Sequence, residues 1–160
     1  MAEIIKLIGI TFIPALELRA SIPYGIFATS LNWIEVFGIC VLANIILGLL
    51  VYQLLETIIR LLIAVKPLRK LWELYVDRTQ RRIKRGVDKY GEWAVMVFIA
   101  IPLPGSGVYT GALASFLIGL SFRKFLIANI FGVLIAGVLV TLACLTGAEA
   151  LRIFIKTISG

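Results

Sequence analysis

Histidine is absent from this chain of 160 residues, and cysteine occurs only twice. Without an imidazole the chain cannot build a histidine-containing metal site or a nucleophile–histidine dyad, so we expect no metal, no cofactor and no enzyme activity. Cys40 and Cys144 both lie in apolar segments, where cysteine usually serves as a small buried hydrophobe. A disulfide between them is the less favoured alternative.

Charged residues are also scarce. They make up 16% of the chain, whereas 61% of the residues are hydrophobic, which is typical of an integral membrane protein. The formal net charge is +7 and most of it lies beside hydrophobic segments, so we expect membrane lipids, including anionic ones, as partners and no nucleic acid. The composition predicts a single membrane domain over residues 1–160.

The chain repeats itself at an offset of 85 residues. The matched positions include polar residues that two unrelated apolar segments would rarely align by chance: Ser21 with Ser106, Tyr24 with Tyr109, and Asn44 with Asn129. We interpret this as an internal duplication, with repeat one at 1–65, a linker at 66–91 and repeat two at 92–160. Duplicated halves that meet at the bilayer midplane are the usual construction of a transporter.

Hydrophobic segment lengths predict the membrane architecture. Crossing the hydrocarbon core takes about 20 residues of helix, and only the segments 36–55 and about 125–145 are long enough. Four shorter segments each lie next to a break that contains proline: 4–13, 22–31, 93–101 and 108–120. We predict an all-α protein of two repeats, each a re-entrant helical hairpin plus one transmembrane helix; one kinked spanning helix is the alternative to each hairpin. A short amphipathic helix is expected over 149–158.

The distribution of positive charge predicts the orientation. Lysine and arginine gather in the linker and at Arg123 and Lys124, whereas the other side carries only Lys6, Arg152 and Lys156. The positive-inside rule then places the linker in the cytoplasm and both termini outside. One crossing per repeat makes the two repeats inverted, the arrangement from which alternating access arises.

The linker itself shows apolar residues at three- and four-residue steps with basic residues between them, which predicts a basic amphipathic helix on the inner leaflet. A chain of this length is too short to form a large transporter alone. We therefore expect a homo-oligomer, with a dimer favoured.

The first interrupted region, 14–25, contains Glu17 and Arg19. A charged side chain at the bilayer centre costs roughly 2.5 to 3.5 kcal/mol on insertion scales, so the two residues indicate either a function or an ion pair that fixes the hairpin. A guanidinium suits bidentate capture of a carboxylate or phosphate, and a desolvated carboxylate could exchange a proton. Ser21 and Tyr24 complete the candidate substrate-binding residues of this half.

The second interrupted region, 101–112, contains two prolines and three glycines and has no Walker-type ending. It offers hydroxyl groups but no charge. Its candidate substrate-binding residues are Pro102, Pro104, Gly105, Ser106 and Tyr109. Small residues here equally suit close helix packing, so both interpretations stand. Asn44 and Asn129, on the two spanning segments, are expected to join helices rather than to bind ligand.

The segments FIPALELRASIPYG, from Phe12 to Gly25, and IPLPGSGVYTGAL, from Ile101 to Leu113, resemble the small multidrug export protein family of prokaryotes. More distantly they resemble the DedA and VTT-domain membrane proteins, whose re-entrant hairpins face each other and which are linked to polyprenyl-phosphate or phospholipid translocation. The halves appear here in the opposite order. The DedA proline-rich hairpin usually carries an acid where this chain has Ser106, so DedA-style proton coupling would require Glu17.

These features together predict a transporter or lipid translocase in a prokaryotic cell membrane. We expect it to move an anionic amphiphile, such as a lipid-linked phosphate, through a site between the two hairpins. One alternative is an exporter of small cationic drugs in which Glu17 is the membrane-embedded anion. A non-transporting membrane scaffold or accessory subunit is the other.

Overall fold

The computed structural model of the chain describes residues 1–14, 16–63, 90–102 and 106–158. Within these ranges the regular structure is entirely helical, as the sequence predicts. The helices are α1 (Ala2–Thr11), α2 (Glu17–Ala28), α3 (Trp33–Ile63), the helix Tyr90–Ala100, α5 (Val108–Leu117) and α6 (Phe122–Ile158). The predicted linker helix, apart from its last residues, and the predicted site residues Pro104 and Gly105 lie outside the described residues.

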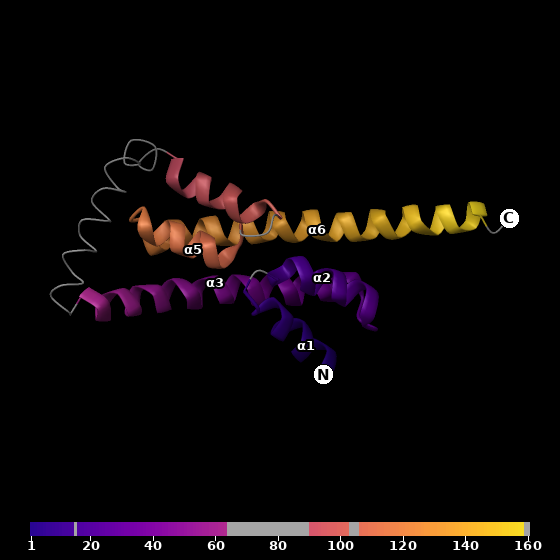
Figure 1. Ribbon diagram of the computed structural model, residues 1–160, viewed down its shortest axis with the longest axis horizontal. Coiled ribbons are helices and arrows are strands. Elements are labelled where there is room, and N and C mark those ends of the chain that lie inside the picture. The colour runs from indigo at the N-terminus through magenta and orange to yellow at the C-terminus, as the bar shows by residue number, and fades with distance from the viewer. Residues whose placement is uncertain (15, 64–89, 103–105, 159–160) are drawn as a thin grey trace.

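The two long helices, α3 and α6, form the centre of the fold. They contain the apolar segments Trp33–Leu55 and Phe122–Gly147, of 23 and 26 residues, each long enough to cross a bilayer that takes about 20. The helices pack together and run in opposite directions (Figure 1). Their outer faces expose large apolar side chains, as lipid contact requires. These include Leu42, Ile46, Leu50 and Leu54 of α3 and Ile127, Phe131 and Leu142 of α6.

Two shorter helical hairpins flank this centre: the first consists of α1 and α2, and the second of the helix Tyr90–Ala100 and α5 (Figure 1). In the first hairpin α1 packs against α2, and in the second the helix Tyr90–Ala100 precedes α5 in the chain. Figure 1 shows α1 and α2 beside one half of the α3–α6 pair and the other two helices beside the opposite half. The turn that follows α1 and the turn that precedes α5 meet near the middle of the long helices, where hydrogen bonds join them.

The structure corrects two expected boundaries. The predicted helix over 149–158 is not a separate element, because α6 continues without interruption to Ile158. No proline follows Phe122, so nothing in the covalent chain forces a break. The second correction concerns α2, which begins at Glu17 and contains Pro23, whereas the sequence predicted an apolar piece starting at Ile22. Packing of α2 against α1, α3 and α6 offsets the backbone hydrogen bond that Pro23 cannot make.

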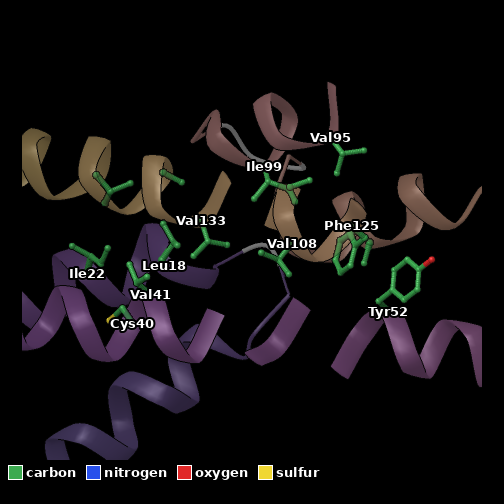
Figure 2. Close-up of a cluster of buried hydrophobic side chains, with 14 of the residues drawn as sticks. Leu18, Ile22, Cys40, Val41, Tyr52, Val95, Ile99, Val108, Phe125 and Val133 are labelled. Atoms are coloured by element: carbon green, nitrogen blue, oxygen red, sulfur yellow. The ribbon is translucent and has the colours of Figure 1, made fainter. Parts of the chain in front are cut away.

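A continuous apolar core joins all of these helices (Figure 2). Fully buried side chains come from each element, among them Ile22, Cys40, Ile99, Val108 and Val133. Helices approach closely at glycines: a Cβ on Gly48 of α3 would lie only 2.5 Å from Asn129 Nδ2. Both cysteines are free, as expected.

An aromatic cluster closes the end of the fold where α3 approaches the beginning of α6. Tyr52 stacks on Phe125 with ring centroids 4.6 Å apart and has Phe116 and Phe122 at its edges. Its hydroxyl donates a 2.6 Å hydrogen bond to the carbonyl of Leu120. These contacts fix the turn between α5 and α6.

Candidate functional site

Glu17 lies at the start of α2 and only 4% of it is exposed. Its carboxylate accepts hydrogen bonds from the backbone N–H groups of Val108, at 3.1 Å, and Tyr109, at 3.4 Å. These are the first residues of α5, whose N–H groups have no partner within their own helix and favour a negative charge. Glu17 of one hairpin therefore caps the helix of the other.

Gly107 makes room for this contact. A Cβ at this position would lie 2.4 Å from both carboxylate oxygens of Glu17, so only glycine allows the carboxylate to reach the start of α5. The N–H of Gly107 donates to Thr110 Oγ1 at 3.0 Å. Glu17 itself has a φ of 45°, a left-handed conformation that is unfavourable for a residue with a Cβ. Tertiary contacts hold this strained residue in place.

Arg19 contacts the other side of the same interruption. Its Nη2 atom donates to the carbonyl of Ile101, at 3.2 Å, to Ser106 Oγ, at 3.2 Å, and to the carbonyl of Ser106. Ile101 follows the last turn of the helix Tyr90–Ala100, where carbonyl groups lack helical partners and favour a positive charge. The second hairpin thus presents N–H groups to Glu17 and C=O groups to Arg19.

Two further hydrogen bonds complete the contact between the turns. Ser106 Oγ donates to the carbonyl of Ile101 at 2.7 Å, and the Tyr109 hydroxyl donates to the carbonyl of Phe12 at 2.6 Å. Among the described residues the side-chain salt bridge is Lys124–Glu92, at 3.2 Å, so backbone groups rather than a mutual ion pair compensate Glu17 and Arg19. The two charges face the other hairpin, as their cost in lipid predicts.

The remaining predicted residues have other surroundings. Ser21 is fully buried inside the first hairpin, where its hydroxyl accepts a 2.8 Å hydrogen bond from Thr11. Tyr24 packs against the apolar core. Asn129 donates from Nδ2 to the carbonyl of Ile45 at 3.1 Å, which joins α6 to α3 as expected. Asn44, which matches Asn129 at the 85-residue offset, is also buried.

A groove of about 500 Å³ opens beside Arg19. Arg19, Pro23 and Phe27 of α2 form one wall, and Pro102 contributes from the second hairpin. The other wall belongs to α6 and consists of Leu139, Val140, Ala143, Cys144 and Gly147. Sequence reasoning identified Arg19 and Pro102 but missed the wall from α6. In the sequence, the only sign of this wall is the recurrence of small or apolar residues every three or four positions.

Residues 17–139 match the family described as Putative small multi-drug export protein, which is well over half of the chain. The chain belongs to this family. The small multi-drug export match includes most of the first interrupted region, from Glu17 onward, and all of the second, so the family resemblance expected from the sequence is confirmed. Together with the two long apolar helices, it places the protein in a membrane. Neither the curated proteins nor the solved structures gave a match.

Proposed function

We propose that this protein is a membrane transporter, not an enzyme, and that it moves a small amphiphilic molecule through the interface between its two hairpins. One observation carries the proposal: a buried carboxylate and a half-buried guanidinium of one hairpin meet the interrupted backbone of the other, beside an open groove. Discontinuous helices with exposed backbone ends near the midplane are typical of transporter substrate sites. The family description supports export as the direction.

The helix lengths support re-entrant hairpins. Helices α1, α2 and α5 contain 10, 12 and 10 residues, half or little more of the roughly 20 that cross a bilayer. Each pair therefore enters the membrane, turns near its middle and returns to the same side. The antiparallel course of α3 and α6 supports inverted repeats, because one crossing per repeat reverses the direction of the second (Figure 1).

The charges around the groove favour an anionic amphiphile, such as a lipid-linked phosphate, as the cargo. Arg19 lines the groove, and its guanidinium can pair with a phosphate or carboxylate. Glu17, the anion that a cationic drug would need, is instead held by the N–H groups of Val108 and Tyr109. Binding a cation through Glu17 would first require breaking this cap.

The orientation that accompanies this function has the linker in the cytoplasm and both termini outside. A second copy of the chain would cover part of the exposed apolar surface of α3, and a homodimer is the assembly we favour. Single cysteines at Asn32, between α2 and α3, and at Thr79, in the linker, test the orientation. They should react with impermeant thiol reagents from opposite faces, and reaction from one face contradicts the inverted arrangement.

The transport proposal is tested in liposomes that contain the purified protein. Flux of a polyprenyl phosphate, a fluorescent phospholipid and ethidium is measured in parallel, with Gly38→Ala as the matched control. For an anionic cargo, Arg19→Ala abolishes flux, Arg19→Lys restores part of it because an ammonium lacks the planar fork, and Ser106→Ala has a smaller effect.

Other outcomes of the flux assay identify the alternatives. Ethidium flux that Glu17→Gln abolishes while Arg19→Ala does not would favour the cationic-drug exporter. If correctly folded wild-type protein carries none of the three compounds, the contacts between the hairpins serve a scaffold or accessory subunit instead.

A further inference from the structure

One face of α2 and one face of α6 line the groove beside Arg19. The wall from α2 consists of Arg19, Pro23 and Phe27, each four residues from the next, so the three side chains lie on one face of the helix. Leu139, Ala143 and Gly147 have the same spacing on α6. The two helices pack together and run in the same direction (Figure 1). Eight residues of helix correspond to a track of about 12 Å, with Arg19 at one end and Phe27 at the other.

Among the described residues that line the groove, Arg19 is the only charged one. Its Nη2 atom donates to Ile101 and Ser106 of the second hairpin, whereas its Nε atom is buried and has no hydrogen-bond partner among the residues that the structure describes. Arg19 also lines the groove, so an anionic group bound there can pair with its guanidinium. The other described residues of the lining are apolar apart from the Cys144 thiol.

We propose that this groove binds a single-chain anionic amphiphile, with its phosphate or carboxylate at Arg19 and its apolar chain along the track toward Phe27 and Gly147. The proposal rests on the transport function proposed above and specifies its substrate class. A volume of about 500 Å³ is within the roughly 300 to 1,000 Å³ usual for small-molecule sites. One track bordered by two helices accommodates one chain, which disfavours a two-chain phospholipid.

Access to the site is one-sided. At the 85-residue offset, Pro23 and Phe27 correspond to Val108 and Ala112 of α5. Phe27 is 62% exposed, whereas Val108 and Ala112 are both fully buried. The surface that forms the groove in repeat one is therefore covered in repeat two. An inverted-repeat transporter that is open to one face would show this difference between its two repeats.

A native cysteine provides the test. Cys144 lines the groove, and the only other cysteine, Cys40, is fully buried and can be replaced by alanine. The rate at which an uncharged thiol reagent modifies Cys144 is measured in proteoliposomes with octyl phosphate, inorganic phosphate or octyltrimethylammonium. Octyl phosphate should slow the reaction about tenfold or more at saturation, since a bound chain covers the thiol. Inorganic phosphate alone and the cationic amphiphile should not protect it.

Substitutions in the groove test which residues bind the amphiphile in this assay. Arg19→Gln should raise the octyl phosphate concentration for half-protection about tenfold or more, because hydrogen bonds to charged groups are the strong ones, and Arg19→Lys should raise it less. Gly147→Leu should block protection by filling the track, since a Cβ there meets nothing within 4 Å. Gly38→Leu is the matched control, because Gly38 is equally open and lies outside the groove, so protection should persist.

The outcomes separate this site from the proposed function. Equal protection by octyltrimethylammonium, or full protection in Arg19→Gln, would overturn the anion site. If inorganic phosphate alone protects Cys144, the proposal of an amphiphilic ligand is wrong and the groove is a simple anion site. If octyl phosphate is transported without protecting Cys144, the groove assignment fails while the transporter stands. Protection without any flux supports the site and contradicts transport.

Discussion

Replacing Glu17 by alanine should lower the free energy of unfolding by about 2 kcal/mol. The substitution leaves the N–H groups of Val108 and Tyr109 without their acceptor. Losing a helix N-cap costs about 0.5 to 2 kcal/mol, and leaving a buried donor unsatisfied costs about 1 to 3 kcal/mol. The substitution also removes the free-energy cost of burying the carboxylate, which offsets part of this loss. Glu17→Gly should cost about 1 kcal/mol less than Glu17→Ala, because glycine adopts the φ of 45° without strain.

Gly107→Ala should be about as damaging as Glu17→Ala, and the two changes should not add. The new Cβ would lie 2.4 Å from both carboxylate oxygens, and overpacking of this kind typically costs about 1 to 3 kcal/mol. Once Glu17 is alanine, the carboxylate is gone and the same Cβ fits. Gly107 has a φ of −147°, which alanine also adopts, so no backbone strain interferes.

The measurement is a double-mutant cycle of reversible unfolding in mixed detergent micelles, followed by tryptophan fluorescence. The double variant should be about 2 kcal/mol more stable than the sum of the single variants predicts, which is within the range of couplings between contacting residues. Gly9→Ala, at a helix position where a Cβ meets nothing within 4 Å, serves as the control. Additive effects of Glu17→Ala and Gly107→Ala would show that the carboxylate does not lie against Gly107.

Four further substitutions are tested by the same unfolding measurement. Gly48→Ala should destabilise by about 1 to 3 kcal/mol, because its Cβ would lie 2.5 Å from the Asn129 amide, whereas Gly38→Ala, in open space, should stabilise by about 0.5 to 1 kcal/mol. Tyr52→Phe should cost about 1 kcal/mol through the lost hydrogen bond to Leu120, with ring stacking retained. Lys124→Met should change stability by no more than about 1 kcal/mol, because its ion pair is solvent-exposed.

The sequence predicted the parts of the fold that the bilayer dictates. Helix type and the two long apolar segments follow from the thickness of the membrane, and the predicted segment starts lie within three residues of the observed ones. The interior position of Glu17 and Arg19 follows from the same cost, since neither charge can face lipid cheaply. That either residue binds a substrate stays a prediction.

The partners of these charges could not be predicted from the sequence. Glu17 and Arg19 contact backbone N–H and C=O groups, which every residue carries and which therefore leave no mark in the residue pattern. The helix start at Glu17, ahead of Pro23, was also missed, because tertiary packing outweighed the usual effect of an internal proline. The wall of the groove from α6 was missed for a related reason: Ala143 and Gly147 have no chemistry that singles them out.

The division of charge between the two hairpins has a consequence for how the chain was assembled. Glu17 and Arg19 have no charged counterparts at the matching positions of the second half, which hold Pro102 and Pro104. Two copies of the first half would bring arginine against arginine, and two copies of the second would leave its helix ends uncapped. The two halves therefore differ in charge and complement each other. Their covalent fusion guarantees a one-to-one ratio of the two halves. If the halves were expressed as separate chains, each would be stable only when the other is present.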